Sequence, residues 1–247
     1  MMVAVAIVLG MVDLLLWSSI LYRQFFKRFY DIVLSGIAII VLSPLLLVLT
    51  IVGAIKMKGN PFFVQPRPGK NERIFNLIKF RSMTCEKDKD GNDLPDDVRL
   101  ISYGKKLRST SLDELPELFN ITKGDMSIVG PRPQLVRDMV FMTEEQRKRH
   151  DVLPGLTGLA QINGRNAIRW EDKLNKDLEY VKGISFFGDI KIILQTALKV
   201  LKRDGITEEG ESTATDFGDY LLQSGKISED KYFKKQLEAR KILCGRG

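Results

Sequence analysis

Cysteine and histidine are scarce in this chain, and their scarcity removes several classes of function. Among 247 residues there are two cysteines, Cys85 and Cys244, which lie far apart. A disulfide framework and a Cys-rich zinc site are therefore excluded. His150 is the single histidine, which removes most histidine-based metal sites and catalytic triads. The G-x-x-x-x-G-K-[ST] phosphate loop and the G-x-G-x-x-G fingerprint are also missing from the sequence.

The balance of charge and hydropathy excludes a disordered chain and suggests an anionic partner. Hydrophobic residues make up 44% and charged residues 28%, as in a folded protein. The net charge of +7 favours phosphates, nucleic acid or an acidic membrane surface. Nucleic acid is the weakest of these, because the basic run Arg147–Arg149 is short and lacks interleaved aromatic residues. We expect that run to be a solvated helix face, His150 to lie on the surface, and no nucleic acid to bind.

The first 21 residues form an apolar segment long enough to cross a bilayer, which takes roughly 20 residues. No Lys or Arg precedes this segment, whereas Arg23, Lys27 and Arg28 follow it, which is unlike a secretory signal peptide. The charge bias favours a signal anchor whose C-terminal end lies in the cytoplasm. An over-long start is the alternative, because Met11 could also initiate translation.

A second apolar segment, Ile32–Ile55, carries Ser43-Pro44 near its middle. Proline removes a backbone donor and kinks a helix, and a serine hydroxyl can satisfy the carbonyl that is freed. Basic residues flank both ends, including Lys56 and Lys58, so the positive-inside rule places both ends on the cytoplasmic side. A helix that enters the membrane, breaks at Ser43-Pro44 and returns satisfies both observations. From charge alone, a plain proline-kinked transmembrane helix is an equal alternative.

The rest of the chain has the pattern of a folded domain with a helical tail. The expected elements are a glycine-containing loop with a short apolar strand or helix over 61–83, a charged loop over 84–98, a helix over 111–121, a small β-hairpin over 153–166, an amphipathic helix over 184–203, a linker over 204–216 and two short helices in the tail. We expect a Ser111 cap to begin the helix over 111–121, because Glu114 stands three residues later. The helix over 184–203 fits either a membrane surface or a core with a basic solvated side.

Two adjacent carboxylates, Asp113 and Glu114, are the leading catalytic candidates. An acid pair among cations can hold Mg²⁺ and can also supply an oxygen nucleophile. Cationic neighbours favour an ionised Asp113 that is ready to attack. The alternative is structural, since acidic residues also favour a helix N-terminus.

Basic residues surround this acid pair in the sequence. Lys79 lies among apolar residues, Arg108 precedes the acid pair, Arg132 stands between two prolines, and Arg165 lies in a glycine-rich stretch. The planar donor fork of a rigidly held arginine binds two phosphate oxygens at once. Together with the apolar segments, this pattern predicts metal-assisted phosphoryl chemistry at a membrane surface.

Four motifs carry a resemblance: IKFRSM (78–83), SLDELPELFN (111–120), KGDMSIVGPRP (123–133) and PGLTGLAQINGRN (154–166). In this order they resemble the bacterial sugar transferase family, the monotopic polyprenyl-phosphate phosphoglycosyl transferases. Within it, the chain is most similar to the small PglC-like transferases of Campylobacter-type protein N-glycosylation, over about residues 22–207. The resemblance implies transfer of a sugar 1-phosphate from a UDP-sugar to a polyprenyl phosphate, with release of UMP.

The resemblance also implies roles for individual residues. Asp113 would be the nucleophile that forms a phosphosugar–aspartyl intermediate, and Glu114 would be the Mg²⁺-associated acid and a candidate base. Phosphate or substrate would be bound by Lys79, Arg108, Arg132, Asn163, Arg165, Asn166 and Asp177, the last with the least defined role. Family members have a re-entrant helix broken at a Ser-Pro pair, which matches Ser43-Pro44 and favours the re-entrant alternative.

The resulting expectation is a mostly helical α+β protein with a small β-hairpin, embedded in the membrane through a re-entrant helix. Its expected parts are an N-terminal apolar helix over 1–21, the re-entrant helix over 22–58, a cytoplasmic catalytic domain with interfacial helices over 59–203, and a linker and helical tail over 204–247. It would act on the cytoplasmic face of the bacterial inner membrane, with Mg²⁺, a UDP-sugar, undecaprenyl phosphate and membrane lipid.

The identity of the sugar and of protein partners is less constrained by the sequence. The resemblance to the small transferases favours an N-acetylated or bacillosamine-like sugar. Transfer of glucose or galactose 1-phosphate for exopolysaccharide is one alternative, and a catalytically silent membrane scaffold is another. A second copy of the chain and the glycosyltransferases of the same pathway are the candidate protein partners.

Overall fold

The computed structural model describes residues 19–164, 168–202 and 215–245. Helices dominate these ranges, and their strands form one antiparallel hairpin and one short parallel pair. The prediction of a mostly helical α+β protein with a small hairpin is confirmed. Residues 1–18 of the apolar helix predicted over 1–21, and most of the predicted linker, lie outside the described residues.

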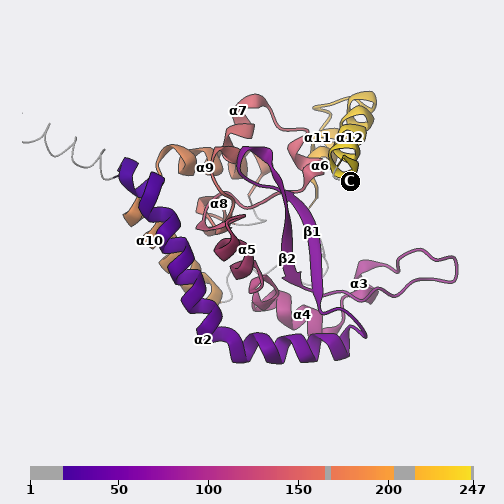
Figure 1. Cartoon of the computed structure of the whole chain (residues 1–247). Helices are drawn as coiled ribbons and strands as arrows, with labels where there is room; N and C mark the ends of the chain where they lie inside the picture. Colours follow the sequence, from indigo (N-terminus) through magenta and orange to yellow (C-terminus); the bar gives the residue numbers. More distant parts are fainter. Residues whose placement is uncertain (1–18, 165–167, 203–214, 246–247) are drawn as a thin grey trace, which may run out of the picture.

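The longest helix begins with a π-helical turn, Tyr22–Phe26, and continues as α2, Lys27–Lys56. The span Ser19–Lys56 is long and apolar enough to cross a membrane, with a mean hydropathy of 2.9 in its most apolar window, of which 17% is buried. Figure 1 shows that α2 bends sharply part way along its length. Pro44 lies inside the helix and has no N–H to donate to the carbonyl of residue 40. The hydroxyl of Ser43 donates to that Ile40 carbonyl instead, at 2.8 Å, so the predicted serine compensation is confirmed.

The inner side of α2 packs on the rest of the chain on both sides of Pro44. Ahead of the proline, Ala38, Ile39 and Leu42 pack against a buried cluster formed by Phe75, Leu77, Leu118, Ile121 and Met126. Beyond it, Leu46 and Leu49 pack with Phe80 and Leu107. The outer side of the helix is apolar and exposed, with Ile40 at 74% and Ile55 at 70% exposure. Apolar side chains therefore cover both sides of α2, and only one side has a protein partner within the described residues.

The antiparallel hairpin joins β1, Phe62–Pro68, to β2, Ile74–Phe80, and pairs Phe62 with Phe80 at its open end. It stands above the part of α2 that follows the bend (Figure 1). On its other edge, β2 is bonded by a side chain: Ile78 N–H donates to Asn120 Oδ1 at 3.0 Å, and Asn120 Nδ2 donates to the Asn76 carbonyl at 2.8 Å. Asn120 is 1% exposed, so this amide is a buried part of the framework around β2.

The hairpin predicted over 153–166 is wrong. There β4, Gly155–Thr157, pairs in parallel with β3, Ser127–Val129, and the chain continues into helix α8, Leu159–Ile162. The glycines serve a close approach between two backbones and not a hairpin turn, because a Cβ on Gly155 would lie 2.1 Å from the backbone nitrogen of Gly130.

Short helices follow the hairpin, after a loop over 84–95 that projects away from the rest of the molecule in Figure 1. They are α3, Asp96–Arg99; α4, Ser102–Ser109; a 3₁₀ turn, Leu112–Glu114; and α5, Glu117–Lys123. The Ser111 cap predicted for one continuous helix is wrong. Ser111 is left-handed, with φ 55°, and its side chain accepts no capping hydrogen bond. An N-cap needs an extended backbone, so this conformation starts a turn and not a helix.

The C-terminal half contains the remaining helices: α6, Val136–Met139; α7, Glu144–Arg147; a 3₁₀ turn, Lys148–Asp151; α9, Trp170–Lys182; α10, Phe186–Lys202; α11, Phe217–Gln223; and α12, Glu229–Cys244. The two short helices predicted in the tail are therefore confirmed as α11 and α12. They dock on the domain, because Phe217 is buried beside Trp170, and Ala239 is buried beside Val136.

Helix α10 has apolar side chains facing both protein and solvent. Ile192 is 4% exposed and belongs to a core cluster, whereas Phe187 is 80% and Leu194 is 60% exposed. Buried Asp189 near its start accepts hydrogen bonds from Tyr22 at 2.7 Å and Lys27 at 2.6 Å. One side of α10 therefore packs in a core and another presents apolar side chains to solvent, and the membrane-surface alternative stays a prediction.

Candidate active site

A compact ion cluster joins strand β2, the 3₁₀ turn before α5 and the segment after β3. Glu114 Oε1 accepts hydrogen bonds from Lys79 Nζ at 2.9 Å and from Arg132 Nη2 at 2.6 Å. Glu114 and Lys79 are each 17% exposed in their side chains, while Arg132 is 40% exposed. The structure therefore brings together three residues that are 18 to 53 positions apart in the chain, and Arg132 remains open to a ligand.

Glu117 is a fourth member of the cluster that the sequence reasoning missed. Its carboxylate lies 3.0 Å from Lys79 Nζ, and its side chain is 2% exposed. Burial raises the pKa of Glu117 to about 7, with the nearby Glu114 charge adding to the rise against the opposing charge of Lys79. The available signal was its spacing, three residues after Glu114, which places both acids within reach of one lysine.

Asp113 lies next to this cluster, on the same 3₁₀ turn as Glu114. Its pKa is raised, first by burial and then by the Glu114 charge, which together outweigh Lys79, Arg132 and Arg108. The cationic neighbours do favour the ionised form, as expected, but burial and the Glu114 charge outweigh them in the protein without substrate. The sequence showed the cations, but it did not show how far the carboxylate is removed from water.

The pKa of Glu114 is shifted in the opposite direction from that of Asp113. Burial alone would raise its pKa, but the charges and hydrogen bonds of Arg132 and Lys79 outweigh burial and hold the pKa well below its usual range. Glu114 is thus a fixed anion, and both of its cation contacts use Oε1.

The donor chemistry of the adjacent pair, Asp113 and Glu114, suits Mg²⁺. This ion takes hard oxygen ligands and is commonly held by one or two carboxylates together with waters and substrate phosphates. No cluster of three or more His, Cys, Asp or Glu side chains that could hold a metal occurs in the described part of the chain. An adjacent pair of carboxylates matches the share of such a site that the protein commonly supplies.

Arg108, at the end of α4, is the third cation that acts on Asp113. Its Nε donates to Ser82 Oγ at 2.9 Å, which ties the arginine to the segment after β2. Ser82 is itself packed against α4, because a Cβ on Gly104 would lie 1.8 Å from the Ser82 carbonyl oxygen. This close backbone contact fixes the base of the Arg108 side chain relative to the hairpin.

Asp177 is placed behind the cluster and not in it. It is 2% exposed, and its Oδ2 accepts hydrogen bonds from Arg149 Nε at 2.9 Å and Nη2 at 2.7 Å. Arg149 Nη2 also donates to the Arg132 carbonyl at 2.6 Å. The pair therefore supports the backbone that presents Arg132, and Asp177 reaches the cluster only through Arg149.

Two surface predictions near this pair are wrong. Arg149 is 1% exposed, and His150 is 5% exposed. Burial lowers the pKa of His150 to about 3, helped by the charge of Arg149, so the ring is neutral at ordinary pH. Arg149 is buried because Asp177, on α9, supplies its counter-charge from a distant part of the sequence.

The predicted nucleotide-sugar residues are only partly placed. Asn163 is exposed just after α8, and its Nδ2 donates to the Leu159 carbonyl at 2.7 Å. Arg165 and Asn166 lie outside the described residues. The structure therefore brings together Lys79 and Arg132 with the acid pair, and it does not bring Asn163 into that cluster.

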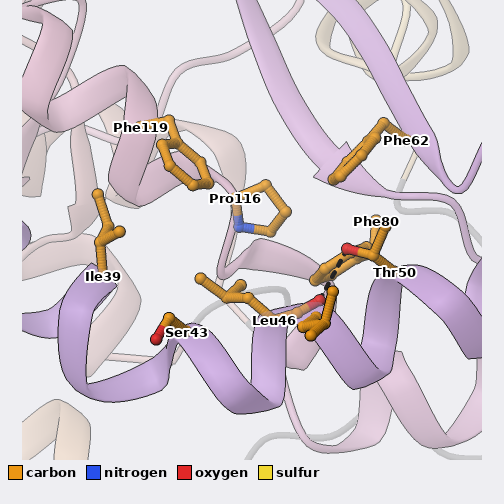
Figure 2. Close-up of a pocket in the computed structure, with 9 residues that line it drawn as sticks. Ile39, Ser43, Leu46, Thr50, Phe62, Phe80, Pro116 and Phe119 are labelled. Carbon is orange, nitrogen blue, oxygen red and sulfur yellow. Dashed lines mark hydrogen bonds between the residues drawn. The ribbon is translucent and has the colours of Figure 1, made fainter.

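An apolar pocket lies between α2 and the elements that carry the ion cluster (Figure 2). Its volume is about 260 Å³, and it is lined from α2 by Ile39, Ser43, Leu46, Leu47 and Thr50, and from the other side by Phe62, Phe80, Pro116 and Phe119. Pro116 follows Glu114 by two residues, and Phe80 follows Lys79 directly. Figure 2 shows Pro116 and Phe119 facing the helix across this space.

The charged cluster has the donor chemistry of a phosphate site, and the apolar pocket beside it has the lining of a site for an apolar ligand. A family model described as bacterial sugar transferase matches residues 22–203. The chain belongs to the bacterial sugar transferase family.

Individual relatives extend this match. The uncharacterized sugar transferase EpsL of Bacillus subtilis is 47% identical over 191 residues, covering 77% of this chain and 95% of EpsL. The UDP-glucose:undecaprenyl-phosphate glucose-1-phosphate transferase of Klebsiella pneumoniae is 41% identical over 184 residues, covering 70% of this chain. The undecaprenyl-phosphate galactose phosphotransferase of Salmonella typhimurium is 36% identical over 200 residues, covering 74%. The chain spans only 40% and 42% of the length of these last two relatives.

Proposed function

We propose that this protein transfers a sugar 1-phosphate from a UDP-sugar to undecaprenyl phosphate and releases UMP. Family membership and the names of the Klebsiella and Salmonella relatives support the reaction class. The observation that carries the proposal is the position of Asp113, beside the Lys79–Glu114–Arg132 cluster and close in sequence to the apolar pocket at Pro116. A charged diphosphate and a lipid chain both find complementary surfaces there.

In the first step, a carboxylate oxygen of Asp113 attacks the sugar-bearing phosphorus of the UDP-sugar. A bond forms between this oxygen and phosphorus, and the bond from phosphorus to the bridging oxygen breaks. The bridging oxygen and its electron pair leave on UMP, so no proton needs to move. Binding a diphosphate among Lys79 and Arg132 brings these cations' donors onto phosphate oxygens, and their charges offset the charge that develops there.

In the second step, a phosphate oxygen of undecaprenyl phosphate attacks the phosphorus of the aspartyl intermediate. The bond to Asp113 breaks, the carboxylate is regenerated, and the sugar diphosphate remains on the lipid. The covalent route divides one difficult displacement into two easier ones. Glu114 keeps Lys79 and Arg132 oriented through both steps. Asp113 and Glu114 would hold Mg²⁺ with the substrate phosphates, where the ion would neutralise developing charge.

The membrane arrangement follows from α2 and the pocket. The helix enters the bilayer, turns at Ser43-Pro44 and returns to the cytoplasmic face, a geometry supported by the bend and by basic residues at both ends. The first isoprene units of the lipid occupy the pocket lined by Leu46 and Phe119, close to the charged cluster. The exposed apolar side of α10 lies in the headgroup region of the same leaflet.

For the sugar, we propose an N-acetylated or bacillosamine-like residue, on the resemblance to the small transferases. Relatives are named for glucose, galactose and, in Aeromonas hydrophila, N-acetylgalactosamine. Glucose and galactose are therefore the alternatives. A panel of UDP-sugars, assayed by UMP release with undecaprenyl phosphate and Mg²⁺, decides between them.

The test of the reaction is Asp113→Asn in the purified full chain, with Asp97→Asn on the exposed surface as the matched control. The Asp113 variant should lose UMP release and the mass-spectrometric phosphosugar adduct on residue 113, while the control keeps both. Turnover retained by Asp113→Asn would refute covalent catalysis at this residue. A well-folded wild type that releases no UMP from any sugar of the panel would instead favour a silent scaffold.

A further inference from the structure

Two further arginines bond the backbone of the segment Pro131–Pro133 from outside the predicted site, and a lysine lies on the neighbouring helix α9. Arg67 Nη1, at the end of β1, donates to the Pro133 carbonyl at 3.2 Å. Arg149 donates to the carbonyl of Arg132 itself. Lys173 lies on α9 one turn before Asp177, the partner of Arg149. Arg132 is therefore linked to Lys79 through their shared contact with Glu114, and its backbone segment is bonded by Arg67 and Arg149.

Two of these cations lack a carboxylate partner within the described ranges. Arg67 donates to Gln65 Oε1 and a carbonyl, forms no ion pair there, and its buried Nε has no hydrogen-bond partner. Lys173 has its ammonium 5.1 Å from the centroid of the Trp170 ring and likewise has no ion pair among described residues. Arg149, in contrast, is fully compensated by Asp177.

The pKa values of Arg67 and Lys173 agree with their lack of a carboxylate partner. Burial lowers the pKa of Arg67 to about 10, and the charge of Arg132 adds to the shift. Burial and Arg132 also lower the pKa of Lys173. Asp138 acts on both residues with the opposite sign but does not cancel the shift. Two partly buried cations without an ion pair, each disfavoured further by the charge of Arg132, are the arrangement expected of an anion site.

We infer that Arg67 and Lys173, together with Arg132, bind the nucleotide-side phosphate of the UDP-sugar and hold it as it leaves on UMP. The inference rests on the proposed function and adds the second half of the diphosphate site. In this arrangement Arg132, whose guanidinium shares Glu114 with Lys79, contacts both phosphates, and Arg67 and Lys173 contact only the leaving one. The sugar-bearing phosphate faces the nucleophile, and the leaving phosphate faces the unpaired cations.

This placement gives the two cations a specific part in the first step. When the bond between phosphorus and the bridging oxygen breaks, that oxygen becomes a terminal oxygen of UMP and carries the new negative charge. Fixed cations beside it stabilise the leaving group without a proton transfer. They take no part in the second step, in which the lipid phosphate attacks the aspartyl intermediate.

The test measures inhibition by UMP and by uridine during transfer of labelled sugar 1-phosphate to undecaprenyl phosphate. In Lys173→Met, the UMP inhibition constant should rise at least about tenfold, because a charge-assisted phosphate contact is lost. Inhibition by uridine, which has no phosphate, and the KM for undecaprenyl phosphate should stay unchanged. Lys176→Met, on the exposed side of the same helix, is the control and should match the wild type.

Arg67→Lys is the second variant, because it keeps a charge in the buried position and limits damage to the fold. This variant should also weaken the binding of UMP and leave the binding of uridine unchanged, since an ammonium cannot reproduce the planar donor fork. Direct UMP binding, followed by ³¹P resonance shifts, gives a readout that needs no turnover. The inference is overturned if the UMP affinity of both variants lies within twofold of the wild type. It is also overturned if both variants lose affinity for UMP and uridine equally. If the wild type binds UMP but transfers no sugar phosphate, only the proposed function fails.

Discussion

The buried pair Arg149–Asp177 allows a quantitative test of how the site is supported. Both side chains are almost completely buried, at 1% and 3% exposure, and Oδ2 of Asp177 takes two hydrogen bonds from Arg149. Asp177→Asn leaves the guanidinium buried without its counter-charge, which costs about 3–5 kcal/mol. For a protein of this size the loss corresponds to a fall in Tm of roughly 6–20 °C.

The assay is thermal unfolding of the detergent-purified protein, followed by circular dichroism, with UMP release measured below the transition. Replacing both partners, as Arg149→Met with Asp177→Leu, should recover much of the loss, because no uncompensated charge remains. The matched control is Lys176→Ala, which breaks an exposed pair with Glu179 on the same helix and should cost less than about 0.5 kcal/mol.

If the Tm of the Asp177→Asn variant lies within about 2 °C of the wild type, a group other than Asp177 compensates the charge of Arg149. That result would refute the stabilising role assigned to the pair. An unchanged Tm together with abolished turnover would instead give Asp177 a direct role in substrate binding, as the family resemblance first implied.

Two further predictions concern α2 and the ion cluster. Ser43→Ala removes the only side-chain donor to the Ile40 carbonyl among described residues and should lower the free energy of unfolding by about 1 kcal/mol. Thr50→Val should cost less, because the carbonyl that Thr50 bonds keeps its backbone partner. Equal losses in the two variants would contradict the explanation that Ser43 compensates for Pro44. Burial raises the pKa of Glu117 to about 7, above 4.5, so the folded chain holds this proton more tightly than the unfolded chain, and this contribution to stability is lost as pH rises through 7. Glu117→Gln should therefore gain stability relative to the wild type between about pH 5 and pH 8, and a pH-independent difference would count against the shift.

Local signals in the sequence were sufficient for the helix break and for part of the site. The proline at position 44 and the neighbouring serine act within one helical turn, so their effect could be derived without tertiary structure. Lys79, Glu114 and Arg132 were singled out by residue type and neighbourhood, and the structure brings them into contact. Their mutual distances could not be derived, because they depend on how the hairpin meets α5.

The hairpin itself was hidden by its composition. Pro66 and Pro68 lie inside β1, and proline in a strand normally argues against that assignment. The segment over 153–166 looked more like a hairpin because it is rich in glycine. There the glycines allow two parallel strands to approach, a tertiary reason that a local pattern does not contain.

Burial was the other quantity that the sequence did not supply. The run Arg147–Arg149 resembled a solvated face, yet Arg149 is enclosed because Asp177 meets it from α9. The cationic neighbours of Asp113 lower its pKa as expected, but desolvation and the Glu114 charge raise it by more. In both cases the charges were visible and their distance from water was not.

The Asn120 amide and the prolines of β1 have a consequence for how this protein behaves among many copies of itself. A two-stranded hairpin leaves two open edges, and open edges recruit strands from other molecules. On β2 the amide of Asn120 occupies the Ile78 N–H and the Asn76 carbonyl, so a foreign strand finds these groups taken. On β1, Pro66 and Pro68 present no N–H at all. Both edges of the hairpin therefore carry features that oppose edge-to-edge aggregation.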